Sequence, residues 1–156
     1  MDENNINLEI ANDNSPMQLV LSGSLEDIDK SKDIFLQNNI KRYVPLKVSA
    51  AFHSKFMLDA QKILSKEINK VTFKNNNIKI ISNYDGGIYE DNSMIMKNLQ
   101  NQMANKVNWT KSIKTLEQTQ EKKIIEFGPN KVLSGLIKRI SDKFDIISIN
   151  EISDIK

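Results

Sequence analysis

The spacing of hydrophobic positions changes along this chain, and it predicts both strands and helices. Short apolar runs that alternate with polar residues or run continuously between turn formers indicate strands. These runs occupy residues 7–11, 18–22, 43–48, 78–82, 124–127 and 146–149. Apolar residues three and four positions apart predict amphipathic helices. They cover residues 25–37, 54–68, 92–103, 109–116 and 132–140.

The order of these elements indicates an α/β chain. The first 48 residues are predicted as strand, strand, helix, strand. From residue 54 onward helices and strands alternate, which is typical of an α/β layer with parallel strand pairing. We find no internal repeat and no low-complexity linker, so the pattern alone does not separate independent domains.

Composition narrows the classes of function. The chain has 156 residues, 39% hydrophobic and 27% charged, as in ordinary soluble proteins. Its 22 basic and 20 acidic residues are spread along the chain, so nothing indicates a nucleic-acid partner. No apolar run approaches the roughly 20 residues that span a bilayer, so no membrane partner is expected. Residues 1–5 are polar and acidic, unlike a targeting peptide, and we expect a cytoplasmic protein.

The absence of cysteine excludes disulfides, thiolate metal sites and cysteine nucleophiles. With a single histidine as well, we expect no metal site. That histidine, His53, lies between a predicted strand and a predicted helix, a place where a side chain can face a cleft and act as an acid or base. A lone histidine in a small domain is more often structural or exposed, so its position leaves both interpretations open.

Four segments together resemble one protein family. They are N-x-N-S-P-x-Q at residues 12–18, A-F-H-S at 51–54, the segment 102–109, and E-F-G-P-x-K-V-L-S-G-L at 126–136. Their order and separation are similar to those in the C-terminal half of malonyl-CoA:acyl carrier protein transacylase, and the resemblance extends from about residue 8 to residue 150. It implies an acyltransferase that moves malonyl from coenzyme A to acyl carrier protein in fatty acid biosynthesis.

The resemblance also implies roles for particular residues. His53 matches the family's catalytic histidine, the base that takes a proton from a serine and returns it to the leaving thiol. An unperturbed imidazole has a pKa of about 6.5, which suits proton transfer in both directions near neutral pH. Gln102 matches the position whose main-chain carbonyl orients this imidazole. No cofactor is implied, because malonyl-CoA is the substrate.

Four further residues match positions that line or shape the family's substrate cleft. Phe52 precedes the histidine, where a ring fills the volume that an α-methyl group of a branched substrate would need. Phe52 could instead be an ordinary core residue. Asn12, Asn14 and Asn83 are the other candidates, and each could instead be a loop residue that hydrogen-bonds its own backbone.

The family's nucleophile is missing from the sequence. It sits in a Gly-x-Ser-x-Gly elbow, and none of the five glycines falls two residues before a serine. Ser54 follows His53 directly, but we expect it to cap the next helix. The arginine that grips the malonyl carboxylate belongs to the family's other half, and Arg42 and Arg139 do not match it.

The resemblance therefore predicts the C-terminal part of the acyltransferase fold. Residues 6–48 would form a partial ferredoxin-like small subdomain, strand-strand-helix-strand, and residues 49–150 the C-terminal part of a large α/β hydrolase-like subdomain. Strand edges and the apolar faces of 124–127 and 132–140 would be exposed, so we expect the isolated chain to be unstable.

Two functions remain open. In the first, the chain is a malonyltransferase fragment that is inactive alone and works with a separate N-terminal transacylase chain. In the second, it is a non-catalytic remnant or a small carrier-protein-binding module with no transferase activity.

Overall fold

The described chain begins with a β-hairpin and one helix. The computed structural model describes residues 6–74 and 77–155. β1 (Leu8–Ser15) pairs antiparallel with β2 (Gln18–Gly23), so the expected strands form, and β1 continues beyond its expected end at residue 11. α1 (Leu25–Gln37) begins at Ser24, whose hydroxyl oxygen accepts the Asp27 N–H at 3.0 Å. Serine is among the residue types favoured at helix N-caps.

The strand expected over residues 43–48 is wrong, because this segment forms no strand. Tyr43 anchors its start by donating from its hydroxyl to the Ile28 carbonyl, but Val44, Leu46 and Val48 are 53%, 58% and 62% exposed. A strand exists only when a neighbour pairs with its backbone, and in the described part of the chain no strand does so here. The segment therefore has the alternating pattern of a strand but lacks a neighbouring strand to pair with.

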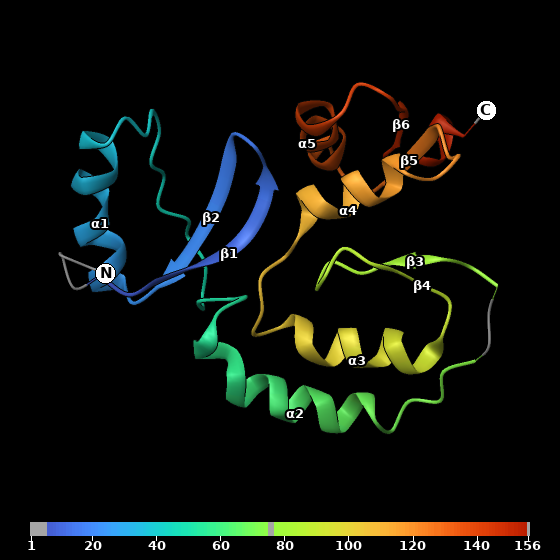
Figure 1. Ribbon diagram of the computed structural model, residues 1–156, viewed down its shortest axis with the longest axis horizontal. Coiled ribbons are helices and arrows are strands. Elements are labelled where there is room, and N and C mark those ends of the chain that lie inside the picture. Colours follow the sequence, from blue (N-terminus) through green and yellow to red (C-terminus); the bar gives the residue numbers. More distant parts are fainter. Residues whose placement is uncertain (1–5, 75–76, 156) are drawn as a thin grey trace.

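The middle of the chain is a pair of helices with a small hairpin. η1 (Lys55–Met57) leads into α2 (Leu58–Ile68), and α3 (Asn92–Gln102) lies beside α2 (Figure 1). β3 (Ile80–Ile81) is shorter than expected, and it pairs antiparallel with β4 (Ile88–Tyr89), which the sequence pattern did not predict. On α3, Ile95 is buried as expected, whereas Leu99 is 48% exposed and Asn98 is buried in its place.

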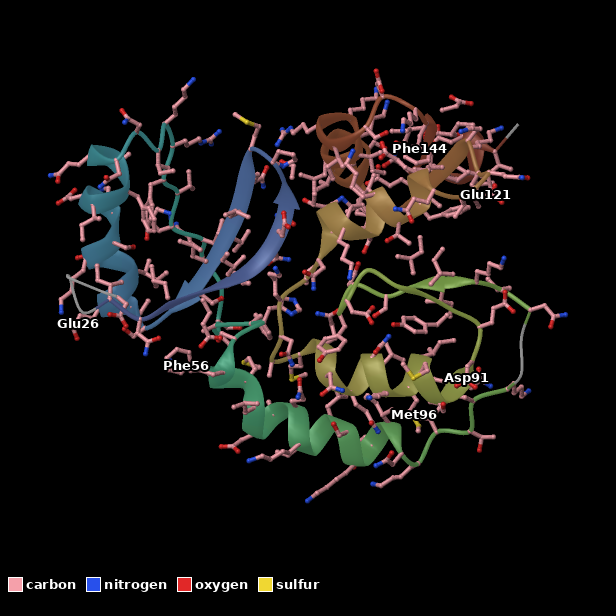
Figure 2. The ribbon with its side chains drawn as sticks, in the orientation of Figure 1. Glu26, Phe56, Asp91, Met96, Glu121 and Phe144 are labelled. Carbon is pink, nitrogen blue, oxygen red and sulfur yellow. The ribbon has the colours of Figure 1, made fainter. Side chains whose placement is uncertain are left out.

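The C-terminal part holds the main apolar core. It consists of α4 (Trp109–Glu117), β5 (Lys123–Phe127), α5 (Val132–Ile140), β6 (Asp145–Ile149) and the short η2 (Ile152–Asp154). β5 and β6 are parallel, with Ile124 opposite Ile146. Ile113 of α4 packs with Ile137 and Ile140 of α5 in a cluster that Phe144 also joins, among the dense side chains beside α5 and β6 in Figure 2.

The α/β class is thus confirmed, but parallel pairing is confined to β5 and β6 among the described strands. The β1–β2 hairpin lies between α1 and the α4–α5 pair (Figure 1), and β1 contacts both α4 and α5. Three consecutive asparagines at residues 75–77 predict a loop, but residues 75 and 76 fall outside the described residues, as do residues 1–5. Within the described ranges, no helix combines the length and apolar character needed to cross a bilayer.

Candidate functional site

His53 is held from two sides by consecutive main-chain carbonyls at the end of α3. Its backbone N–H donates to the Met103 oxygen at 3.0 Å, and its Nδ1 lies 3.0 Å from the Gln102 oxygen. A carbonyl oxygen can only accept, so Nδ1 must carry the proton of this hydrogen bond. In the neutral ring Nε2 then keeps its lone pair, and no described residue hydrogen-bonds to it.

The backbone of His53 is in an unusual conformation. Its φ is +60°, in the left-handed region, which disfavours residues other than glycine by about 1–2 kcal/mol. Residues held in such conformations cluster at functional sites, where surrounding contacts enforce them. The bond to Met103 is one such contact, and it fixes the direction in which the imidazole leaves the chain.

The β-hairpin supplies further contacts that position this turn. Ser22 of β2 donates its hydroxyl to the Phe52 carbonyl at 2.8 Å. Glu9 of β1 accepts the Lys55 backbone N–H at 3.0 Å, and the Lys55 ammonium lies 3.6 Å from the same carboxylate. The residues on both sides of His53 are therefore tied to the hairpin. Sequence reasoning missed Ser22 and Glu9, because neither lies in a motif and both act across a long separation in sequence.

The carbonyl side of the site is fixed by α2. Gln61 accepts the Ala104 N–H at 2.8 Å, and the Gln102 side chain donates to the Asn105 carbonyl at 3.1 Å. Ala104 is buried, so these bonds lie where water competes little. The turn after α3 is consequently held in the shape that points the Gln102 carbonyl at His53.

Ser54 is not available as a nucleophile. It is fully buried, and its hydroxyl donates to the Ala51 carbonyl at 2.6 Å. Ser54 does occupy the N-cap position of η1, as expected, but its side chain makes no capping bond. Its hydroxyl instead closes the turn that contains His53.

Phe52 is 44% exposed, so the alternative that it is an ordinary core residue is wrong for this structure. Phe52 directly precedes His53 in the sequence, and its main-chain carbonyl accepts the hydrogen bond from the Ser22 hydroxyl. An exposed aromatic ring is available to contact a substrate or another part of a larger protein.

Two of the three candidate asparagines lie along the segment that follows Gln102. Asn12 of β1 forms an isolated bridge with Val107, whose carbonyl accepts the Asp13 N–H at 2.9 Å and whose N–H donates to the Ala11 carbonyl at 2.8 Å. The Asn83 carbonyl accepts the Asn108 N–H at 2.7 Å. Asn14 lies further along β1, beside a register shift, and no hydrogen bond in the described part of the chain joins it to Asn12 or Asn83.

The side-chain amides of these asparagines make no hydrogen bond within the described residues. The alternative that each one bonds its own backbone is therefore not what the structure has. Asn12 and Asn14 are partly buried and Asn83 is exposed. A hollow of about 360 Å³ lies beside the same segment, but its lining contains none of the expected site residues. It is formed by Tyr84, Asp85, Asn105, Lys106, Asn108 and Lys111.

The turn of the E-F-G-P motif has a structural role centred on Glu126. This buried carboxylate of β5 accepts the backbone N–H groups of Leu133 and Ser134 at 2.8 and 2.9 Å, and also the Ser134 and Ser148 hydroxyls. It thereby caps the N-terminus of α5 from a neighbouring strand. Burial acts to raise the pKa of Glu126, but the hydrogen bonds outweigh it and the pKa lies below its ordinary value. Asn130 in the following turn has a φ of +73°, a left-handed conformation that asparagine adopts more readily than most residues.

No metal centre emerges from the acidic residues. Across residues 6–74 and 77–155, no three His, Cys, Asp or Glu side chains gather as metal ligands would. The groups that could do chemistry are therefore the imidazole, the carbonyl that fixes it, and the amides around the segment 102–108.

Comparison with known proteins agrees with the motifs. The chain is 31% identical to the malonyl CoA-acyl carrier protein transacylase of Synechocystis over 151 residues, which is 97% of this chain and 50% of that protein. It is 37% identical over 137 residues to the polyketide biosynthesis malonyl CoA-acyl carrier protein transacylase BaeC of Bacillus velezensis, covering 87% of this chain and 47% of that protein. No family model matches the chain.

Solved structures show the same likeness. A malonyl-transacylase solved in complex with its type II polyketide acyl-carrier protein matches with a TM-score of 0.89 and 28% identity, over 96% of this chain and 48% of that one. The resemblance to the C-terminal part of these enzymes is therefore confirmed, as is the acyltransferase fold. The chain spans about half the length of the curated transacylases it matches.

Proposed function

We propose that this chain, which is homologous to the C-terminal half of malonyl-CoA:acyl carrier protein transacylases, carries the catalytic base for malonyl transfer. It acts together with the half of the enzyme that supplies the nucleophilic serine, and the product is malonyl-acyl carrier protein for fatty acid biosynthesis. The observation that supports this proposal is the fixed imidazole of His53, with Nδ1 bonded to the Gln102 carbonyl and Nε2 free.

The chemistry follows from that arrangement. Nε2 takes the proton of the serine hydroxyl as its oxygen attacks the malonyl thioester, so a C–O bond forms and the C–S bond to coenzyme A breaks. The proton then passes from Nε2 to the leaving thiolate. The second half-reaction runs in reverse with the thiol of the acyl carrier protein, which leaves His53 and the serine as they began.

The role of Gln102 in this proposal is to orient the ring. A catalytic imidazole in a serine enzyme is commonly oriented by a carboxylate, which adds a full negative charge. A carbonyl gives the same tautomer without that charge. The hydrogen bond from the His53 backbone N–H to the Met103 carbonyl reinforces the direction of the ring, since both contacts come from the same turn.

We further propose that Phe52 and the three asparagines bind the substrate. The Phe52 ring, which directly precedes the base in sequence and is exposed, would exclude an α-branched acyl group. Asn12, Asn14 and Asn83 carry amides with no hydrogen-bond partner in the described part of the chain, and such groups can bind a carboxylate or thioester oxygen.

Three broader expectations belong to the same proposal. Residues 6–48 and 49–150 act as parts of a small and a large subdomain. The reaction uses malonyl-CoA as substrate and needs no separate cofactor. The protein works in the cytoplasm, where acyl carrier protein and malonyl-CoA are its partners.

A second candidate function is a non-catalytic remnant or carrier-protein-binding module. It is favoured by one observation: the serine nearest His53 in sequence, Ser54, is buried and already engaged with Ala51. Binding to acyl carrier protein without malonyl transfer, even when the other half of the enzyme is present, would select this alternative.

The test is a transfer assay with radiolabelled malonyl-CoA and acyl carrier protein. The 156-residue chain is assayed alone and after co-expression with the half of the Synechocystis transacylase that it does not match. We expect no covalent adduct on the chain alone, and transfer by the pair that falls by about 100-fold or more in His53→Ala. A malonyl adduct on the isolated chain, or full activity of His53→Ala, would contradict the proposal.

A further inference from the structure

The two-stranded β5–β6 sheet has one covered face and one open face. Side chains alternate across a strand, so Ile124 and Ile146 point toward the α4–α5 core. Ile125 and Phe127 of β5 and Ile147 of β6 alternate with these residues and point away from the core. We call these three residues the open face, and they are 45%, 73% and 36% exposed, respectively.

Such a face is unusual for parallel strands. Parallel sheets are found almost only with both faces covered, and their strands are apolar on both sides for that reason. β5 and β6 likewise carry apolar residues on both sides, as in a sheet that is covered on both faces. The described part of the chain covers only the face toward α4 and α5. Neither β5 nor β6 has a second strand neighbour in the described part, so both outer edges of the sheet are also open.

We propose that the open face is the docking surface for one partner, a polypeptide that corresponds to the half of the transacylases this chain does not match. This rests on the proposed function and adds where the two halves meet. The chain matches only about half of each solved transacylase, yet it keeps their fold with TM-scores of 0.86 to 0.89. The remaining half of such a structure has to pack against this one. The open face is apolar, as the covered faces of a parallel sheet are, and is therefore suited to this contact.

A second copy of this chain is a weaker occupant for the same surface. Two copies could cover each other's open faces, but neither would gain the second half that its relatives possess. The partner half can both cover the face and add strands at the open edges, which satisfies the unpaired backbone groups as well.

The experiment measures binding directly. The tagged full chain is co-expressed with the unmatched half of the Synechocystis transacylase, and the complex is quantified by co-purification and by titration of the separated proteins. Phe127→Asp and Ile125→Asp each replace an apolar side chain of the open face by a carboxylate, which removes an apolar contact with the partner. We expect each to raise the dissociation constant by about 30-fold or more.

The matched control is Leu25→Asp, which also introduces a charge at an exposed apolar residue. Leu25 is 90% exposed at the start of α1, and α1 and β5 lie at opposite ends of the molecule (Figure 1). This variant is expected to bind as the unsubstituted chain does. Circular dichroism of all three variants shows whether the fold is kept. We expect that it is kept, because the substituted residues are exposed.

The outcomes separate cleanly. Loss of binding in both open-face variants but not in Leu25→Asp supports the proposal. Unchanged binding in those variants, no binding by the unsubstituted chain, or a homodimer that Phe127→Asp dissolves would each overturn it. Malonyl transfer is recorded separately: a complex that forms through the open face but transfers no malonyl refutes the proposed function and leaves the docking surface standing.

Discussion

The buried carboxylate of Glu126 offers the most quantitative test of how the C-terminal part is held together. It joins β5 to the first turn of α5 and to Ser148 of β6 through hydrogen bonds. Lys131, at the N-cap position of α5, makes no side-chain capping bond. Glu126 is therefore the side chain that satisfies the free N–H groups of this helix end.

Replacing Glu126 by alanine leaves the N–H groups of Leu133 and Ser134 without an acceptor. A buried donor without a partner costs about 1–3 kcal/mol, and loss of an N-cap costs about 0.5–2 kcal/mol. These terms overlap, so we expect Glu126→Ala to lower the free energy of unfolding by about 2–4 kcal/mol. Glu126→Gln keeps one acceptor oxygen and is expected to lower it by about 1–2 kcal/mol.

The effect depends on pH with a definite sign. The pKa of Glu126 is lowered in the folded chain from its ordinary value of 4.5, so the charged form stabilises the fold. This stabilisation is fully present above pH 4.5 and is lost as the pH falls through the lower, folded-state pKa. The difference between the unsubstituted chain and Glu126→Gln should therefore shrink in acid.

The assay is urea unfolding followed by circular dichroism, in an osmolyte that strengthens a marginal fold. The matched control is Glu121→Gln, because Glu121 is exposed just before β5 (Figure 2) and its carboxylate makes no hydrogen bond in the described chain. A loss below about 0.5 kcal/mol in Glu126→Ala, or an equal loss in Glu121→Gln, would refute the assignment of Glu126 as the cap of α5.

Three further predictions follow from the same contacts. Ser54→Ala removes the bond to Ala51 and should lower the free energy of unfolding by about 1 kcal/mol without changing malonyl labelling of the assembled halves; loss of all labelling would instead make Ser54 a reacting group. Ser22→Ala frees the Phe52 carbonyl and should broaden the NMR signals of His53, whereas Ser22→Thr, which keeps the hydroxyl, should not; identical spectra for all three would refute this positioning role. The isolated chain should bind a hydrophobic dye and aggregate on mild heating, because many of its large apolar side chains are exposed; a chain that binds no dye and stays soluble on heating would contradict this.

The sequence predicted the helices well, because an amphipathic helix carries its pattern locally. α5 shows this: Leu136, Ile137 and Ile140 are the buried stripe that the spacing indicates. The expectation that the apolar face of 132–140 would be exposed is wrong for this stripe, since α4 and β5 cover it within the chain. It holds only at the start of α5, where Val132 and Leu133 are 62% and 41% exposed. The open face of β5 agrees with the expectation for 124–127 at Ile125 and Phe127 only.

Strands were predicted less well, because a strand depends on a neighbour that the local pattern does not contain. The segment 43–48 alternates like a strand and forms none, while Ile88 and Tyr89 form one without a recognisable run. For the site, the motif around His53 located the imidazole, and the resemblance located Gln102. The contacts from Ser22 and Glu9 could not be anticipated, since they depend on how distant elements meet.

The most direct test of the account is the tautomer of the one imidazole in the chain. His53 is the only histidine among the 156 residues, so long-range ¹H–¹⁵N NMR of the imidazole nitrogens in the uniformly labelled chain at alkaline pH reports this residue alone. The structure predicts a pyrrole-type nitrogen at Nδ1, bonded to the Gln102 carbonyl, and a pyridine-type nitrogen at Nε2. A proton resident on Nε2 would contradict the account, because the ring would then present a donor where the reaction needs a base.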